Sequence, residues 1–318
     1  MKVLANDGIA PSGKKALEDA GFTVVTDTVA QENLVNEIND KEYEVLLVRS
    51  ATKVRKDIID NCPSVKMIGR GGVGMDNIDV EYARDKGIEV FNTPASSSQS
   101  VAELVMAHLF GSVRFLYQAN REMPTKGTTD FGSLKKSYAK GTELRGKTLG
   151  IVGFGRIGKS VASYALGCGM KVMVYNRSKD SFEVSLKIEG LDQDVQLTLQ
   201  NNSLEDVLKS SDFISLHVPA TDDYLIGEKE FGIMKQGAVL VNAARGGVVN
   251  EDALIAALDS GKLAHAALDV FEGEPKPSDK IVHHPKISLS PHIGAATVEA
   301  QDRIGTELAE QIIDYYKK

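Results

Sequence analysis

The sequence predicts an α/β fold with two doubly wound parallel-sheet domains and a cleft between them. Short apolar runs alternate with polar helical stretches along the chain, which is the pattern of parallel strands crossed by helices. A cluster of glycines at residues 153–158 lies between a strand and a helix near the middle of the chain, so a complete domain precedes it. At 318 residues the chain is long enough for two full cores.

Five apolar runs predict the sheet of the first domain. They occupy residues 3–5, 22–25, 45–48, 65–68 and 88–91. A glycine-rich loop at residues 69–77 follows the fourth run and is suited to an anion. The segment 92–98, with Pro94 and three serines, breaks regular structure and predicts a hinge into the next domain.

A long helix is expected after the hinge. Ser100 and Glu103 have the spacing of a capping box, so the helix should start there. His108 falls on its apolar stripe, which favours a core or interface histidine over a catalytic one. Residues 120–142 are polar and partly basic, the character of an arm that could embrace a second subunit, and we therefore expect a homodimer or homotetramer.

The glycine cluster predicts a dinucleotide-binding unit. An apolar strand at 149–152 ends in Gly153, Gly155 and Gly158, and a helix and a second strand follow. Gly153 permits the tight turn, Gly155 lets the backbone approach a pyrophosphate, and Gly158 lets helix and strand pack closely. The unpaired N–H groups at the start of the helix would then attract the phosphates.

The residue at the end of the second strand leaves the choice between NAD and NADP open. An acid that binds the adenosine ribose is expected 18 residues after Gly158, and Asn176 stands there, followed by Arg177. A carboxylate would bind the 2′-hydroxyl of NAD and repel a 2′-phosphate, whereas a neutral amide beside a guanidinium tolerates or favours that phosphate. Alternatively, Arg177 stacks on adenine or lies in solvent, and NAD binds without the acid.

The rest of the chain predicts a hairpin and the remainder of the second sheet. Alternating apolar residues at 182–188 and 195–199 predict a hairpin beside the adenosine end of the cofactor. Ser203 and Asn250 should cap two helices, and strands are expected at 213–218, 238–242, 264–270 and 287–289. Residues 297–316 have helical spacing and should return to the first domain. We therefore expect a flavodoxin-like substrate domain at 1–97 plus 291–318 and a Rossmann cofactor domain at 98–290.

Composition excludes several classes of partner. The chain has 37 Lys plus Arg against 44 Asp plus Glu, so it lacks the basic surplus with which proteins bind nucleic acid or an anionic membrane. No apolar run approaches the 18 residues of a membrane span. Cys62 and Cys168 are far apart and lack metal-ligand spacing, so we expect no metal site and a reducing, cytoplasmic compartment.

Three polar residues follow strands of the second sheet at the edge where ligands of doubly wound sheets bind, namely Arg245, Glu274 and His292. The guanidinium can hold the carboxylate of a 2-keto or 2-hydroxy acid and polarise the keto oxygen. The imidazole can deliver or remove the hydroxyl proton, and the glutamate can orient that imidazole. Taken singly, Arg245 could form an ion pair at a helix end, Glu274 could be a loop acid, and His283 or His284 could be mistaken for the working histidine.

Asp269 is placed to accept a hydrogen bond from the nicotinamide carboxamide. The residues expected to contact the dinucleotide are Gly153, Gly155, Arg156, Ile157, Gly158, Asn176, Arg177, Ser178, His217, Pro219, Ala243, Asp269, His292 and Gly294.

Six motifs together resemble the D-isomer-specific 2-hydroxyacid dehydrogenases, and their order and spacing cover essentially the whole chain. The motifs are Gly69-Arg-Gly-Gly-Val-Gly-Met-Asp-Asn77, Asn92-Thr-Pro94, Gly153-Phe-Gly-Arg-Ile-Gly158, Asn242-Ala-Ala-Arg-Gly-Gly247, Ala267-Leu-Asp-Val-Phe-Glu-Gly-Glu-Pro275 and Ser290-Pro-His-Ile-Gly294. The resemblance implies that Arg245, Glu274 and His292 form the catalytic triad. It also implies that backbone groups at Val73 and Gly74 hold the substrate carboxylate.

Within the family the chain looks most like the members that oxidise 3-phospho-D-glycerate to 3-phosphohydroxypyruvate in serine biosynthesis. The likeness lies in residues 48–54, 69–77 and 140–147. It implies that Arg49 and Arg70, together with the partner subunit's Lys136, contact the substrate phosphate.

The chain departs from the family pattern at three places. Asn176 stands where many members carry Asp, and the 180–202 hairpin looks longer than usual. The chain also stops at Lys318, so we expect no serine-binding C-terminal domain and no feedback through one.

Two other functions remain open from the sequence. A hydroxypyruvate or glyoxylate reductase would share the triad and need no phosphate site, and Asn176 with Arg177 gives it some support. A dinucleotide-sensing binding module like the C-terminal-binding-protein corepressors, which resemble this family and keep its triad, is a more remote alternative.

Overall fold

A computed structural model describes residues 1–317 and divides the chain into two compact units. Unit 1 comprises Met1–Ser100 and the segment from Ala295 onward, and unit 2 comprises Val101–Gly294. The divisions lie three and four residues beyond the expected positions, because Ser100 shares a hydrogen bond with Thr297 and Gly294 donates to Asp269. The expected domain also included Lys318, which lies outside the described residues. The cleft between the domains stays a prediction.

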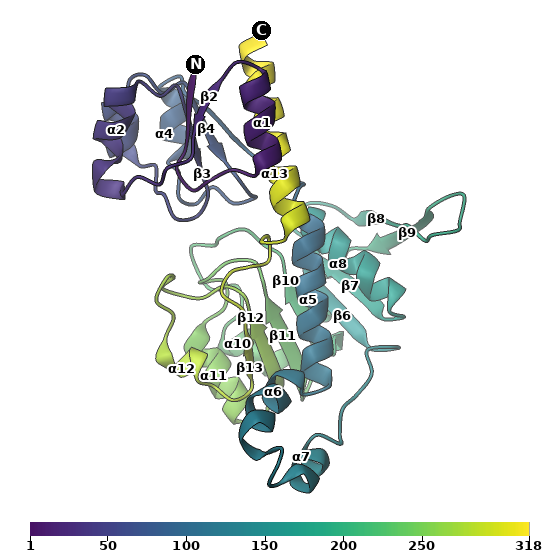
Figure 1. The fold of residues 1–318 in the computed structure, drawn as a ribbon. Coiled ribbons are helices and arrows are strands. Elements are labelled where there is room, and N and C mark those ends of the chain that lie inside the picture. The colour runs from purple at the N-terminus through teal and green to yellow at the C-terminus, as the bar shows by residue number, and fades with distance from the viewer. Residues whose placement is uncertain (318) are drawn as a thin grey trace. The chain divides into compact units, whose positions relative to one another are not determined.

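Unit 1 is a five-stranded parallel sheet in the order β2-β1-β3-β4-β5 (Figure 1). The five expected apolar runs are confirmed as its strands. The strands are β1 Lys2–Ala5, β2 Thr23–Val25, β3 Val45–Val48, β4 Met67–Arg70 and β5 Glu89–Asn92. The helices are α1 Pro11–Asp19, α2 Leu34–Lys41, α3 Lys56–Asn61, α4 Val80–Asp85 and α13 Val298–Lys317, with a short 3-10 helix at Gln31–Asn33.

Alternation along the strands fills the two faces of this sheet. Val3 packs in a cluster with Leu17 of α1 and Ile304 of α13, whereas the next residue, Leu4, packs in a cluster with Ile38 of α2. Because successive strand side chains point to opposite faces, helices are needed on both sides. The C-terminal helix α13 thus completes the first domain, as the sequence predicted.

Unit 2 is a six-stranded parallel sheet in the order β13-β12-β11-β10-β6-β7 with a separate hairpin β8-β9 (Figure 1). The strands are β6 Thr148–Val152, β7 Lys171–Tyr175, β8 Ser181–Leu186, β9 Val195–Gln200, β10 Phe213–Leu216, β11 Ala238–Asn242, β12 Leu263–Leu268 and β13 Ile287–Leu289. The helices are α5 Ser98–Val113, which begins in unit 1, α6 Leu116–Lys126, α7 Phe131–Ser137, α8 Arg156–Gly167, α9 Leu204–Ser210, α10 Glu228–Ile233, α11 Glu251–Asp259 and α12 Asp279–Val282.

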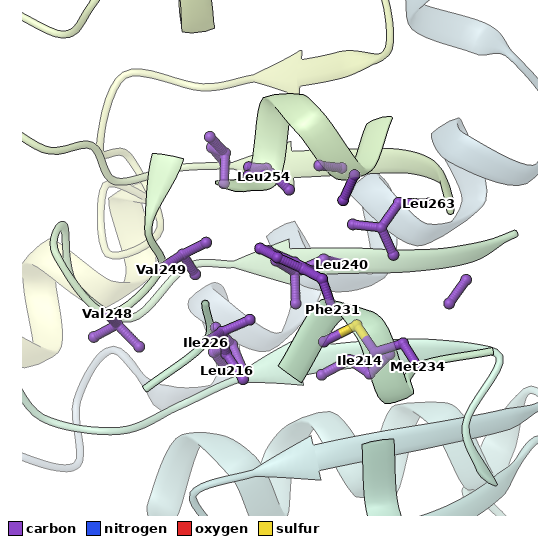
Figure 2. Packing of buried hydrophobic residues seen from close by; sticks show 14 of the residues in the cluster. Ile214, Leu216, Ile226, Phe231, Met234, Leu240, Val248, Val249, Leu254 and Leu263 are labelled. Carbon is purple, nitrogen blue, oxygen red and sulfur yellow. The ribbon is translucent and has the colours of Figure 1, made fainter. Parts of the chain in front are cut away.

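Each face of this sheet has its own core. On one face, Leu240 of β11 packs in a cluster with Phe231 of α10 and Leu254 of α11 (Figure 2). On the other face, Val241 belongs to a cluster with Leu109 of α5 and Val161 of α8. The two faces together confirm the doubly wound α/β fold.

One expectation about local structure is wrong. Helix α5 starts at Ser98, so the capping box at Ser100–Glu103 lies inside the helix. Ser100 instead shares a hydrogen bond with Thr297, and Glu103 accepts one from Tyr164. Most of residues 120–142, the segment expected to form an arm, lies in α6 and α7.

The hairpin and the two later helix caps are confirmed. Strands β8 and β9 pair antiparallel, and the Ser203 and Asn250 side chains accept hydrogen bonds from Asp206 N and Ala253 N. Cys62 and Cys168 are free thiols, and burial raises the pKa of Cys62 to about 11. None of the helices described is both long and apolar enough to span a membrane.

Candidate active site

The carboxyl edge of the unit 2 sheet has a point where the chain reverses its direction across the sheet. Strand β6 lies between β7, which follows it in sequence, and β10, which the chain reaches after returning past β6. At such a point the loops after the two neighbouring strands diverge and leave a crevice for a ligand. Gly153 follows β6 and His217 follows β10, so both lie at this crevice.

The turn from β6 into α8 has the geometry of a phosphate-binding loop. Gly153 has a φ of +93°, and a side chain there would collide with the carbonyl oxygen of His217. A Cβ built on Gly155 meets no protein atom within 4 Å, so the space before the turn is open. Helix α8 begins at Arg156 and no side chain caps it. Its first N–H groups are therefore available to an anion, and the residues fit a dinucleotide pyrophosphate.

A pocket of about 250 Å³ adjoins this turn. Its lining consists of Gly153, Phe154, Gly155, Tyr175, Asn176, Arg177, His217, Val218, Pro219, Thr221 and Leu225. His217 accepts or donates a hydrogen bond at Nε2 to Ser215, and its buried Nδ1 lacks a partner among the described residues. Burial lowers the pKa of His217 to about 3, so the imidazole is neutral. A neutral ring with one unused nitrogen can contact a bound nucleoside.

The Asn176 segment is held by the residue that follows β9. Asn201 Oδ1 accepts a hydrogen bond from Asn176 N at 2.9 Å, and Asn201 Nδ2 donates to Asn176 O at 2.8 Å. Arg177 and Ser178 are exposed, and Arg177 forms no ion pair or hydrogen bond within the described part of the chain. Arg177 lines the pocket described above.

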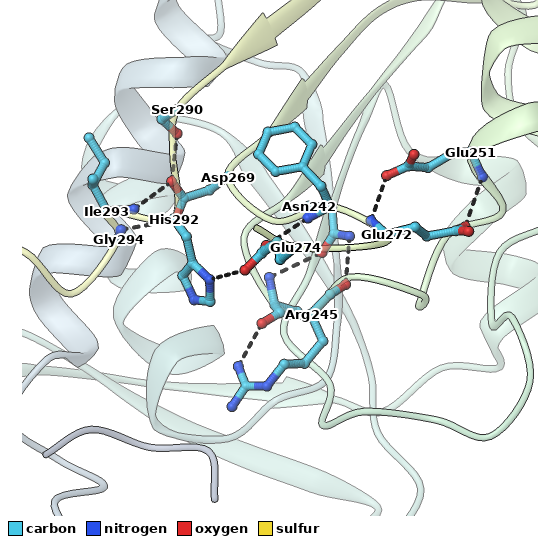
Figure 3. Close-up of polar contacts among 12 residues, drawn as sticks. Asn242, Arg245, Glu251, Asp269, Glu272, Glu274, Ser290, His292, Ile293 and Gly294 are labelled. Atoms are coloured by element: carbon cyan, nitrogen blue, oxygen red, sulfur yellow. Dashed lines mark hydrogen bonds and ion pairs between the residues drawn. The ribbon is translucent and has the colours of Figure 1, made fainter. Parts of the chain in front are cut away.

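Three neighbouring strands present the expected triad. Arg245 follows β11, Glu274 follows β12 and His292 follows β13, and these strands are adjacent and parallel. Their carboxyl ends therefore lie along one edge of the sheet. In Figure 3 the Arg245 guanidinium and the His292 imidazole both extend away from these strand ends.

Glu274 and His292 form a hydrogen-bonded pair. His292 Nδ1 lies 2.8 Å from Glu274 Oε2, and Glu274 Oε1 accepts from Phe271 N at 2.8 Å (Figure 3). Because an ionised carboxylate can only accept, Nδ1 carries the proton and Nε2 is left as a proton acceptor. The His292 side chain is 41% exposed, so this nitrogen can reach a substrate.

Arg245 is positioned by Asn242. The Asn242 side chain accepts from Ala244 N at 3.0 Å and donates to Arg245 O at 3.0 Å, which fixes the turn after β11. Arg245 Nη1 donates to Ala244 O at 2.6 Å. The planar guanidinium matches the two oxygens of a carboxylate in shape and charge.

Asp269 has a structural role that the sequence did not indicate. The carboxylate is 2% exposed and accepts from Ser290 Oγ, Ile293 N and Gly294 N at 2.7, 2.9 and 2.9 Å. It therefore holds the loop that contains His292 (Figure 3). With about four acceptor sites on a carboxylate, one remains for the proposed carboxamide.

The other expected dinucleotide residues lie along the same edge of the sheet. Arg156 and Ile157 are in the first turn of α8, and Ala243 directly follows β11. Gly294 is buried, and a Cβ there would lie 3.1 Å from Asp269 Oδ2. Their contacts with a dinucleotide stay a prediction.

The expected substrate residues of unit 1 gather at one loop. Arg49 follows β3 and Arg70 ends β4, the adjacent strand. A Cβ built on Gly71 would lie 3.5 Å from Arg49 Cγ, and Arg70 Nη1 donates to Gly71 O at 3.4 Å. Both side chains thus border the loop that contains Val73 and Gly74.

The structure does not bring Lys136 to the triad. This exposed lysine lies in the last turn of α7. Phe115 directly precedes α6, and Lys140 follows α7. Both residues line one cavity together with residues at the start of β10, β11 and β12. This is the amino edge of the sheet, opposite the triad.

Among the residues of this site that sequence reasoning missed are Thr221, Leu225 and Asn201. Thr221 and Leu225 line the pocket, and Asn201 holds the Asn176 segment. None of them lies in a motif or directly after a strand of the main sheet, so no pattern could identify them. Asn242 is the first residue of one of the six motifs and stands three positions before Arg245. That spacing was the available signal that it holds the turn before Arg245.

A family model and individual proteins of known sequence are similar to this chain. Residues 106–294 match the family model for the NAD binding domain of D-isomer specific 2-hydroxyacid dehydrogenases. The hydroxypyruvate reductase of Thermotoga maritima is 44% identical over 85% of this chain and 84% of its own length. The D-3-phosphoglycerate dehydrogenase of Methanocaldococcus jannaschii is 40% identical over 98% of this chain, which spans only 57% of that protein.

Among solved structures, the D-lactate dehydrogenase of Aquifex aeolicus in complex with NAD and lactic acid is similar, with a TM-score of 0.77 and 31% identity. The match covers 100% of this chain and 96% of that chain. The family match spans more than half of the sequence and includes the dinucleotide turn and the three strand ends described above. The chain therefore belongs to the D-isomer-specific 2-hydroxyacid dehydrogenases, which are NAD-binding oxidoreductases.

Proposed function

We propose that this enzyme is a D-3-phosphoglycerate dehydrogenase, which oxidises 3-phospho-D-glycerate to 3-phosphohydroxypyruvate for serine biosynthesis. The observation that carries the proposal is the pair of arginines, Arg49 and Arg70, beside the glycine loop of unit 1. A phosphorylated 2-hydroxy acid has two anionic ends. Arg245 suits the carboxylate near the reacting carbon, and the two unit 1 arginines suit the phosphate.

The triad supplies the acid-base chemistry of this reaction. Arg245 would hold the carboxylate and polarise the C2 oxygen, while backbone groups at Val73 and Gly74 hold the carboxylate's other side. His292 Nε2 would take the hydroxyl proton as the C2 oxygen becomes a ketone, and Glu274 would stabilise the resulting imidazolium. A nicotinamide dinucleotide bound at the β6–α8 turn would supply the hydride acceptor.

The cofactor is proposed to be NAD or NADP. Asn176 offers no carboxylate to repel a 2′-phosphate, and the exposed Arg177 would contact that group. Asp269 is proposed to accept from the carboxamide, and His217 and Pro219 to contact the adenosine.

The experiment compares substrates in arginine variants. Arg49→Ala and Arg70→Ala should each lower kcat/KM for 3-phospho-D-glycerate about 10- to 100-fold, since a hydrogen bond to a charged group is worth roughly 1.5–3 kcal/mol. Reduction of glyoxylate, which has no phosphate, should change less than about threefold if the arginines touch only that group. Arg84→Ala, at an exposed arginine of α4 paired with Glu81, is the matched control.

Equal losses on both substrates would instead favour a hydroxypyruvate or glyoxylate reductase. One observation supports this second candidate, namely the 44% identity with a relative that is named a hydroxypyruvate reductase. Direct comparison of kcat/KM for 3-phospho-D-glycerate oxidation and hydroxypyruvate reduction ranks the two functions. The corepressor-like alternative requires that no 2-hydroxy acid is turned over.

We also propose that the enzyme forms homodimers or homotetramers through α6 and α7. Leu116 and Phe131 on these helices are 57% and 58% exposed, and large exposed apolar side chains are typical of interfaces. Light scattering should give a multiple of 34.3 kDa, and Phe131→Asp should lower the mass. Loss of phosphoglycerate turnover in Lys136→Ala, with glyoxylate reduction retained, is the result expected if the partner's Lys136 contacts the phosphate.

A further inference from the structure

A buried histidine in unit 2 is connected to the loop that holds His292. His108 of α5 is 8% exposed, and both of its ring nitrogens face serine hydroxyls. Nδ1 lies 3.0 Å from Ser288 Oγ and Nε2 lies 3.0 Å from Ser290 Oγ. Ser288 is in β13, and Ser290 lies two residues before His292.

The direction of these hydrogen bonds follows from the number of protons. Ser290 Oγ lies 2.7 Å from Asp269 Oδ1, and because an ionised carboxylate only accepts, the single hydroxyl proton of Ser290 points to Asp269. Ser290 must then accept from His108 Nε2–H. In the neutral ring Nδ1 is the acceptor for Ser288. Burial lowers the pKa of His108, which agrees with a neutral imidazole.

The Asp269 carboxylate, the last group in this series of hydrogen bonds, determines the conformation of the His292 loop. Asp269 accepts from Ile293 N and Gly294 N, both at 2.9 Å. Between Ser290 and these amides, His292 has a φ of +53°, which non-glycine residues seldom adopt. Such a conformation persists only when the surrounding structure enforces it, and here Asp269 and Ser290 supply that constraint.

We propose that His108 is a positioning residue for the reaction, because it orients Ser290 and thereby fixes the Asp269 carboxylate and the His292 loop. The proposal rests on the proposed roles of Asp269 and His292. A purely structural histidine would contribute only to the stability of the core. The two cases differ in what happens to dinucleotide affinity and kcat when the histidine is replaced.

The first test compares three replacements of His108. Leu removes both hydrogen bonds, Asn is too short to reach Ser290, and Gln has an amide N–H donor that reaches about as far from the backbone as Nε2 does. His108→Leu and His108→Asn should lower kcat and raise the Kd for the reduced dinucleotide, with about a tenfold loss in kcat/KM. His108→Gln should recover most of both. Because Asn and Gln are polar and differ by one methylene, the comparison does not depend on the Leu variant folding.

The matched control is His265→Leu. His265 of β12 is half-buried and burial lowers its pKa as well, but it pairs with Tyr117 and makes no hydrogen bond to the His292 loop within the described residues. This variant should lose stability and keep its kcat and dinucleotide Kd. A similar loss of activity in the control would overturn the proposal, since burial alone would then explain the effect.

The second test is a double-mutant cycle with Ser290→Ala. If His108 acts through Ser290, His108→Asn should cost less than about twofold in dinucleotide Kd once Ser290 is alanine. Full additivity would overturn the proposal, as would unchanged kcat and Kd in both His108→Leu and His108→Asn.

Isothermal titration calorimetry gives the Kd without any turnover, so the two proposals can fail separately. If no 2-hydroxy acid is oxidised but the cycle shows coupling in Kd, the proposed function fails and the role of His108 stands. If turnover is normal and the His108 variants match the wild type in kcat and Kd, the role of His108 fails alone.

Discussion

Glu274 and His292 come from loops after two adjacent strands, and a single 2.8 Å hydrogen bond joins them. The carboxylate directs the proton to Nδ1 and leaves Nε2 free for substrate. Neither residue is deeply buried, so their proposed roles depend on how the two side chains are oriented. Predictions at the residue scale therefore concern the loss of one hydrogen bond or one charge.

Glu274→Gln should lower kcat about 100-fold, because a neutral amide no longer stabilises the imidazolium that forms when His292 takes the proton. The KM for the 2-hydroxy acid should change little, since Glu274 is not expected to contact it. Steady-state kinetics on the purified variant measures both. Glu272→Gln is the matched control, because Glu272 lies two residues away and bonds Glu251 N and Tyr224 instead of His292. Equal losses in the two variants would contradict the assigned role.

Asn176→Asp should raise the preference for NAD over NADP at least about tenfold, whichever cofactor the wild type prefers. The new carboxylate can accept from the ribose 2′-hydroxyl and repels a 2′-phosphate. The measurement is the ratio of kcat/KM for the two cofactors. Asn176→Ala removes the amide without adding charge and should leave the ratio nearly unchanged; a ratio unaffected by Asp would mean that this side chain does not face the ribose.

At the scale of elements, the turn between β6 and α8 combines two demands on glycine that differ in origin. Gly153 is required by the protein itself, because its φ is +93° and the His217 carbonyl occupies the place of a Cβ. A Cβ at Gly155 would meet no protein atom within 4 Å, so only a bound ligand would require that this position lack a side chain.

This difference can be measured. Gly155→Ala should leave the free energy of unfolding within about 1 kcal/mol of the wild type and raise the dinucleotide Kd at least tenfold. Gly153→Ala should lower the free energy of unfolding by about 1–3 kcal/mol, in addition to weakening binding. Urea denaturation and calorimetric titration provide the two quantities. Normal dinucleotide affinity in Gly155→Ala would exclude a pyrophosphate at this turn.

At the scale of the whole molecule, several buried or half-buried histidines link stability to pH. Burial lowers the pKa of His108, His217 and His265, to about 3 for His217. In the unfolded chain these imidazoles bind protons below the ordinary histidine pKa of about 6.5, whereas in the folded chain they do so only at lower pH. Stability should therefore be greatest above pH 6.5 and fall as the pH decreases toward 3.

For His217 alone the expected loss between pH 7.5 and 5.5 is about 1.4 kcal/mol, because only the unfolded state takes up the proton in this range. Urea denaturation of the wild type and of His217→Asn at both pH values isolates this contribution as the difference between their pH dependences. His283→Asn, at an exposed histidine after α12, should match the wild type. The same pH dependence in wild type and His217→Asn would show that His217 is not buried in its neutral form.

The strand pattern alone predicted most of the architecture. Apolar runs and the polar stretches between them have local periods, so the five strands of unit 1, the strands of unit 2 and the return of the last helix to the first domain could be inferred. Because parallel strands end at one edge, Arg245, Glu274 and His292 were expected together, and the structure places them after three adjacent strands.

The sequence could not predict contacts between segments that share no local pattern. Ser100 and Glu103 have capping spacing, yet Ser100 bonds Thr297 from 197 positions away and α5 starts earlier. His108 was expected in the core, but its bonds to Ser288 and Ser290 span 180 and 182 positions.

The sequence by itself therefore determined which elements form and which residues end the strands, because local periodicity and the common direction of parallel strands depend only on neighbours along the chain. Only the tertiary structure decided how those residues are held. Examples are the hydrogen bonds between Asp269 and the His292 loop and between Asn201 and Asn176. Each joins segments that meet only after the sheet has formed.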